Sequence, residues 1–307
     1  MLTIIYFLIS ICIVAVHFVW VSGVMKRLPH ISSLHMLSIS HVFAALILFW
    51  FAQDELNLLF IHQDLLWNIL ALSLCMLVAR LLYYYAFSKA DVSEVSIFSS
   101  LTPAYTLIIA PLFGYTLALT EMLGVLLISA SVYFFFLKRK EDGALHLQDL
   151  LSPFHKIISS RPLFYTFLST FPPAFATIFQ KEALSTGSPY LIGFAMCAII
   201  GTTGCMIEMF MRCNKNHQPR GGAAPINIYQ SKWLYTSIAG ILQAAAIVSI
   251  SFLLTQTHPA SMQALLRFAI PLQIILAWML LKEKKDLKHR LTASLLAILG
   301  GYLVLCE

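Results

Sequence analysis

Ten apolar segments, separated by short polar connections, run along this chain. Because an α-helix rises about 1.5 Å per residue, about 20 apolar residues are enough to cross the hydrocarbon core of a membrane. The pattern therefore predicts an all-α polytopic membrane protein with ten transmembrane helices. The predicted helices comprise residues 3–24, 33–52, 66–87, 92–113, 120–137, 162–180, 189–211, 232–254, 259–281 and 290–306.

Composition supports a membrane protein and excludes an ordinary soluble domain. Of 307 residues, 59% are hydrophobic and 11% are charged, whereas soluble domains have about 25% charged residues. The net charge of +6 is explained by basic loops on one side of a membrane, so no nucleic-acid partner is expected. The six cysteines include no CxxC pair, and we expect neither a metal site nor a disulfide framework.

The distribution of basic residues predicts how the chain is oriented. Connections after the first, third, fifth, seventh and ninth segments share one side of the membrane, and the other side has Lys181 alone. Lysine and arginine accumulate in cytoplasmic loops, so both termini are predicted to lie outside the cytoplasm, with a bacterial inner membrane as the expected location. The basic side holds Lys26, Arg27, Lys89, Lys138, Arg139, Lys140, Lys156, Arg161, Arg212, Lys215, Arg220, Lys232, Lys282, Lys284, Lys285, Lys288 and Arg290.

The two halves of the chain show a weak internal repeat. An offset of 168 residues places Pro103 on Pro271 and "VSEVSIFSSLTPAYTLIIAPL" on "ASMQALLRFAIPLQIILAWML". A repeat of five helices is odd in number, so its second copy must be inverted in the membrane. Inverted repeats are typical of secondary transporters, whose substrate site lies between the halves. The predicted parts are a first repeat, residues 1–137, a cytoplasmic linker, residues 138–161, and a second repeat, residues 162–307.

The same stretches carry a family resemblance. "YYYAFSKADVSEVSIFSSLTPAYTLIIAPLFG", followed by "TEMLGVLLISASVYFF", resembles the EamA-type repeat of the drug/metabolite transporter superfamily. "THPASMQALLRFAIPLQIILAWMLLKEKKDLKHRLTASLLAILGGYLVL" is similar to the second copy, with Glu283 at the usual acidic position. "VHFVWVSGVMKRLPHISSLHMLSI" resembles the first helix of the family and its turn.

The resemblance implies export or exchange of a small metabolite by alternating access, without naming the substrate. The chain departs from the family pattern at Gly114-Tyr115, where a Gly-Glu pair is common, and near Ser40-His41, where an arginine is common. Family members are usually assigned cytoplasmic termini, whereas the charge distribution of this chain predicts the opposite.

Prolines within the predicted helices indicate bends. Proline removes a backbone hydrogen bond, and a membrane helix tolerates this loss where neighbouring helices or a cavity satisfy the freed carbonyl groups. We expect these residues to act as hinges beside a central cavity. The hinge candidates are Pro103, Pro172, Pro173 and Pro271.

Two arginines lie deep in the predicted helices, where a charge needs a partner or an aqueous cavity. Arg80 is expected to pair with Glu94 near the cytoplasmic face, where Asp91 is expected to cap the following helix. Arg267 has no acid in its own helix and is predicted to contact an anionic group of the substrate. The alternatives for Arg267 are a pair with Glu208 and hydrogen bonds to backbone carbonyl groups.

The remaining candidate residues are polar or aromatic. His17 and His41 can exchange a proton near neutral pH, although a lone membrane histidine can equally be a satisfied structural residue. The predicted site lies between helices 1, 3, 4, 6, 8 and 9. The substrate-binding candidates are Arg267, Trp20, Tyr84, Tyr105, His17 and Gln263, and the gating or coupling candidates are Glu94, Arg80 and His41.

The function that follows is a secondary active transporter or exchanger of a small metabolite, anionic or zwitterionic, and not an enzyme. The alternatives are a lipid-linked sugar flippase on the same fold and a polytopic membrane enzyme. The chain has no P-loop and no HExxH or GxSxG motif, and no cofactor is expected. Expected partners are the substrate, membrane lipids and protons as a coupling ion, for a monomer or a homodimer.

Overall fold

The computed structural model describes residues 2–28, 31–115, 119–136, 157–214, 226–283 and 287–305. Within these ranges the ordered elements are helices, and no β-strand is present. Every predicted segment coincides with a helix or with a pair of successive helices. The elements of the first half are α1 (Leu2–Arg27), α2 (Ser33–Ala52), η1 (Gln53–Glu55), α3 (Leu58–Ile61), α4 (Gln63–Lys89), α5 (Val92–Ser99), α6 (Thr102–Ile109), η2 (Ala110–Phe113) and α7 (Leu119–Phe136).

The second half has the same helical character. Its elements are α9 (Arg161–Ser169), α10 (Pro172–Ala183), α11 (Pro189–Asn214), α12 (Ile226–Gln256), α13 (Pro259–Leu265), η3 (Leu266–Phe268), α14 (Ala269–Leu281) and α15 (Leu287–Leu305). The predicted linker falls mostly outside the described residues, which resume at residue 157.

Three predicted helices are interrupted near their centres, at α5–α6, α9–α10 and α13–α14. In each case a proline lies in the first turn of the second piece: Pro103 in α6, Pro172 in α10 and Pro271 in α14. Proline is tolerated there because the first amide groups of a helix have no partner within that helix. The prolines therefore mark the positions where each helix restarts.

Seven segments of the described chain are long and apolar enough to cross a membrane. They are Tyr6–Arg27, Ser33–Glu55, Gln63–Lys89, Val92–Phe113, Pro189–Met211, Lys232–Gln256 and Pro259–Leu281, and Met122–Val132 and Arg290–Leu303 are shorter apolar helices. Large apolar side chains such as Leu46, Trp50, Leu74 and Ile108 lie exposed on the outside of the bundle, while many serines and threonines are buried. An apolar exterior around a partly polar interior is the arrangement that lipid favours, and the chain is a multi-pass membrane protein.

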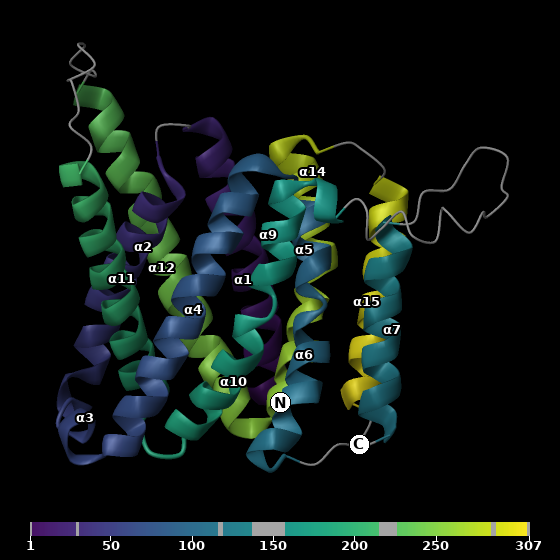
Figure 1. The fold of residues 1–307 in the computed structure, drawn as a ribbon, viewed down its shortest axis with the longest axis horizontal. Coiled ribbons are helices and arrows are strands. Elements are labelled where there is room, and N and C mark those ends of the chain that lie inside the picture. Colours follow the sequence, from purple (N-terminus) through teal and green to yellow (C-terminus); the bar gives the residue numbers. More distant parts are fainter. Residues whose placement is uncertain are drawn as a thin grey trace, which may run out of the picture.

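The helices form one bundle (Figure 1), with α7 and α15 packed together at one edge and α2, α11 and α12 at the other. The helices between these edges include α1, α4 and the three interrupted pairs. The start of α1 and the end of α15 lie at the same end of the bundle (Figure 1). We call this end the terminal face. We call the opposite end, where α1, α4 and α14 end, the basic face.

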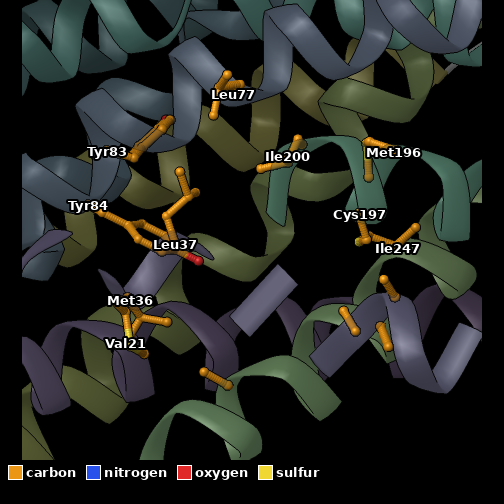
Figure 2. Close-up of a cluster of buried hydrophobic side chains, with 14 of the residues drawn as sticks. Val21, Met36, Leu37, Leu77, Tyr83, Tyr84, Met196, Cys197, Ile200 and Ile247 are labelled. Carbon is orange, nitrogen blue, oxygen red and sulfur yellow. The ribbon is translucent and has the colours of Figure 1, made fainter. Parts of the chain in front are cut away.

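The largest cluster of buried apolar side chains lies among α1, α2, α4, α11 and α12 (Figure 2). It includes Leu37, Tyr84, Cys197 and Ile247, which come from four of these helices. Close helix packing beside this cluster depends on small residues. A Cβ atom on Gly240 would lie 2.5 Å from the Cβ atom of Phe43 and 2.8 Å from the Ser40 carbonyl oxygen.

Gly300 allows the same close approach between α15 and α7, as expected for a small residue in a membrane helix. A Cβ atom at this position would lie 2.6 Å from the Gly124 carbonyl oxygen and 2.8 Å from the Ile128 amide nitrogen. Both neighbours are backbone atoms, which cannot move aside without shifting a helix.

We therefore predict that Gly300→Ala lowers the free energy of unfolding by about 1–3 kcal/mol, the usual range for overpacking. The measurement is thermal unfolding of the purified protein in detergent. Gly187→Ala is the matched control, because its new Cβ atom would meet only side-chain atoms, at 3.4 Å or more. Equal melting temperatures for the two variants would contradict the close packing of α7 and α15.

Candidate functional site

A cavity of about 130 Å³ lies in the middle of the bundle. It is bounded by α1, α4, the α5–α6 pair, α10, α12 and the α13–α14 pair. These are the six predicted helices 1, 3, 4, 6, 8 and 9. Its polar lining residues are His17, Arg80, Tyr83, Ser99, Thr102, Thr177, Gln180, Gln263, Arg267 and Gln273.

Arg267 lies in η3, at the interruption between α13 and α14, and is buried. Its guanidinium group donates to the backbone carbonyl and hydroxyl oxygens of Ser99, the latter at 2.8 Å. It also donates to the carbonyl oxygen of Gln263 at 2.9 Å and to the side-chain oxygen of Gln263 at 3.1 Å. All four acceptors are neutral, so these contacts position the guanidinium group without cancelling its charge.

Ser99 accepts this contact because α5 ends there. A helix interruption leaves carbonyl groups without their usual partners, and the Ser99 carbonyl oxygen is in reach of Arg267. Of the two alternatives for Arg267, hydrogen bonding to backbone carbonyl groups is therefore observed. Glu208 contacts His35 instead, at 3.2 Å. A role for Arg267 in anion binding stays a prediction.

Arg80 also lines the cavity, and its guanidinium carbon lies 5.6 Å from the centre of the Phe18 ring. Its Nε atom is buried without a hydrogen-bond partner among the described residues. A pair between Arg80 and Glu94 stays a prediction. Arg80 lies about two turns inside the end of α4, beside the cavity, whereas Glu94 is in the first turn of α5.

The two histidines are both buried, but they occupy different positions. His17 lines the cavity, and both of its ring nitrogen atoms lack a hydrogen-bond partner in the described chain. His41 lies outside the lining, and its Nδ1 atom is 2.8 Å from the Leu37 carbonyl oxygen. Arg80 is close enough to act electrostatically on both rings. A coupling role for His41 remains a prediction.

Gln263 lines the cavity as expected, and its side-chain amide donates to the Thr177 hydroxyl group. This contact connects α13 with α10. Tyr83, Gln180 and Gln273 also line the cavity, although they were not among the candidate residues. The signal that could have identified the two glutamines is an amide within or at the end of an apolar helix, which must find a polar partner there.

Three aromatic candidates do not line the central cavity. Tyr84 is fully buried in the apolar cluster (Figure 2), because one residue turns a helix by about 100° and only Tyr83 faces the cavity. Trp20 donates to the Tyr235 carbonyl oxygen at 3.1 Å and lines a separate groove. Tyr105 packs edge-on against Phe171. A role for these three residues in ligand binding stays a prediction.

The basic face holds a network of charged groups centred on Glu283. Its buried carboxylate accepts from Lys26 at 3.0 Å, from the Val92 amide at 2.9 Å and from the Ser93 hydroxyl at 2.8 Å. Arg290 lies 3.5 Å from the same carboxylate. The network therefore joins α1 and α5 with α14 and α15.

Glu283, and not Asp91, caps α5. Asp91 occupies the N-cap position without a side-chain hydrogen bond to the helix, and its carboxylate accepts from Arg290 at 3.0 Å instead. The expected capping role of Asp91 is wrong because two basic side chains, Arg290 and Lys26, compete for its carboxylate. The Ser93 hydroxyl group also accepts a hydrogen bond from Arg290.

The terminal face is held by fewer charges. The Tyr115 hydroxyl group donates to Glu182 at 2.7 Å, and the Tyr115 ring packs edge-on against His258. Burial and the neighbouring Glu182 carboxylate raise the pKa of Tyr115. Lys181 donates to the Leu254 carbonyl oxygen at the end of α12, at 2.6 Å. Across the described chain, no group of three or more metal-ligating side chains is found.

Comparison with known proteins agrees with the membrane fold. A protein of known crystal structure is similar over 99% of this chain and 96% of its own, with a TM-score of 0.65 and 12% sequence identity. At this identity the likeness concerns the fold alone. No curated protein matches the sequence. The model of the EamA-like transporter family matches residues 1–137. This match confirms the resemblance over residues 1–137, and the apolar helices show that the chain is a multi-pass membrane protein.

Proposed function

We propose that the protein is a secondary active transporter or exchanger that moves a small metabolite by alternating access, and that it is not an enzyme. The observation that carries this proposal is a cavity in the middle of the bundle, lined by two arginines and bordered by pieces of three interrupted helices. Helix interruptions around a midplane cavity are typical of secondary transporters. The family match adds the transporter-like class.

We also propose the finer architecture of ten transmembrane helices in two inverted five-helix repeats. Two observations support it. The offset of 168 residues equates Ser99 with Arg267, and these two residues are in contact, as residues beside a two-fold axis would be. The same offset aligns the helix interruption after α5 with the helix interruption at η3. The proposed repeats remain residues 1–137 and 162–307, joined by the linker 138–161.

The Glu283 network is proposed to close the basic face. It ties α1 and α5 of the first repeat to α14 and α15 of the second through a buried carboxylate. The same offset equates Glu283 with Tyr115, so the terminal face lacks the equivalent carboxylate. The two faces thus differ in how strongly charge holds them shut, and opening the basic face requires separating ion pairs.

The remaining parts of the proposal concern orientation, coupling ion, hinges and oligomeric state, and the charge distribution supports the orientation. The basic face is assigned to the cytoplasm of a bacterial inner membrane, with both termini outside it. Protons are the proposed coupling ion, with His17 and His41 as candidate acceptors, and Pro103, Pro172, Pro173 and Pro271 are the proposed hinges. Monomer and homodimer both fit this mechanism.

A lipid-linked flippase is the second candidate function, and one feature favours it. An apolar groove of about 260 Å³ lies beside α1 between α12 and α14, with Trp20 in its wall and Arg27 at its end. Such a groove could hold the lipid chain of a lipid-linked ligand. Liposome assays with water-soluble and lipid-linked ligands distinguish the two functions.

The transporter proposal predicts the order of activities of the Arg267 variants. Arg267→Gln should slow substrate counterflow in liposomes by about tenfold or more, because a hydrogen bond to a charged group contributes about 1.5–3 kcal/mol. Arg267→Lys retains the charge but loses the planar fork, so its loss should be smaller. Assays use matched protein amounts, and melting temperature is measured in parallel. Normal counterflow by well-folded Arg267→Gln would refute this role of Arg267.

The proposed closure predicts a large stability effect at Glu283. Glu283→Ala removes the partner of Lys26 and Arg290 and should lower the free energy of unfolding by about 3–5 kcal/mol, the usual effect of breaking a buried pair. Glu182→Ala is the matched control on the terminal face, because Glu182 is exposed and exposed pairs contribute about 0–1 kcal/mol. Thermal unfolding in detergent measures both. If Glu283→Ala and Glu182→Ala have the same melting temperature, the network does not hold the basic face closed.

A further inference from the structure

The central cavity has two positive charges that its own walls leave uncompensated. Arg80 and Arg267 both line it, and the described lining residues include no aspartate or glutamate. Arg267 contacts neutral acceptors on Ser99 and Gln263. Arg80 faces the Phe18 ring, and its Nε atom has no hydrogen-bond partner within the described ranges.

The two charges line one cavity of about 130 Å³. Tyr83 lies in the same wall of the cavity, and both arginines influence its hydroxyl group electrostatically. A ligand beside Tyr83 could therefore contact both guanidinium groups. Electrostatic interactions are stronger in such a poorly solvated interior than in water.

We propose that the cavity binds a compact dianion, with anionic oxygen atoms on both Arg80 and Arg267. This inference rests on the proposed transport function and narrows its substrate from anionic or zwitterionic metabolites to dianions. A guanidinium group offers a planar fork that matches carboxylate and phosphate oxygen atoms. Two such groups without an internal counter-ion match a ligand that carries two negative charges.

A zwitterion fits the same cavity poorly. Its ammonium group would lie near two guanidinium groups, and the described lining provides no carboxylate to receive it. Only neutral acceptors would remain for the ammonium group, such as the side-chain oxygen atom of Gln273, which has no hydrogen-bond partner among the described residues. Like charges at short distance disfavour each other strongly where the dielectric constant is low.

The size of the cavity limits the dianion. A volume of about 130 Å³ approaches the roughly 150 Å³ of an engineered cavity that holds benzene. The ligand should therefore have about six to eight non-hydrogen atoms, as in a short dicarboxylate or a small phosphate monoester. Both have the chemistry that the two arginines recognise.

The test uses ligands matched in size that differ in charge. Succinate is the dianion, succinamate the monoanion and 4-aminobutyrate the zwitterion, while methyl phosphate and dimethyl phosphate form the phosphate arm. The full-length protein is reconstituted in liposomes, and counterflow and ligand-induced melting shifts are measured. We expect at least one dianion to bind about tenfold tighter than its matched monoanion, since a second charged hydrogen bond has about that effect.

The variants assign the preference to the arginines. Arg80→Gln should remove the advantage of the dianion over its monoanion, and Arg80→Lys should retain part of it. Arg161→Gln is the control, because Arg161 is an exposed arginine at the start of α9. If Arg80→Gln does not fold, Arg80→Lys and the ligand series on the unmodified protein still decide the outcome.

Three results would overturn the inference in different ways. Counterflow of the monoanion or the zwitterion in preference to its matched dianion would reject the dianion and leave the transport function standing. Failure of both dianions, succinate and methyl phosphate, to bind or accumulate would likewise reject the dianion without rejecting transport of another substrate. Equal preference for dianions in Arg80→Gln and in Arg161→Gln would also reject the two-arginine site.

Discussion

Arg80 and Arg267 keep positive charge inside a bundle whose outer surface is apolar. A charge near the centre of a membrane costs about 2.5–3.5 kcal/mol on insertion scales, so the surrounding structure must accommodate it. It does so partly through the interruption of α5, which leaves the Ser99 carbonyl oxygen to accept from Arg267. The cavity itself provides the rest of the space around both guanidinium groups.

The polar contacts at the two faces of the bundle also differ. On the basic face, Glu283 has two basic partners and the free amide groups of α5. On the terminal face, Tyr115 contacts a single carboxylate, that of Glu182. A transporter whose faces are held by unequal contacts favours one closed state, and ligand binding must supply the difference to reach the other.

Much of the fold could be predicted from the sequence, because helix length and proline position are local properties. The interruptions near Pro103, Pro172 and Pro271 follow from the missing amide hydrogen of proline. The cavity-lining positions of Arg267, His17 and Gln263 also agree with the predicted set of helices. Membrane insertion makes a buried polar group conspicuous in an apolar sequence.

The contacts between distant segments could not be predicted in this way. Tyr83 and Tyr84 are adjacent and chemically alike, and only the rotation of α4 determines that Tyr83 faces the cavity. Asp91 looked like a local cap, yet Glu283, from the distant connection after α14, takes that role. Such choices depend on the competition among several partners, which a single sequence does not reveal.

The central claim is that the cavity binds a ligand and that the Glu283 network closes it on the basic face. The accessibility of the cavity from that face tests this claim. The measurement is the labelling rate of Thr102→Cys, a cavity-lining position, in a chain without its six native cysteines. A membrane-impermeant thiol reagent is added from the basic face. The account predicts slow labelling that Glu283→Ala accelerates and that a bound dianion slows again. The account would be contradicted if Thr102→Cys were labelled at the same rate with Glu283 and with Glu283→Ala, and if a bound dianion did not change either rate.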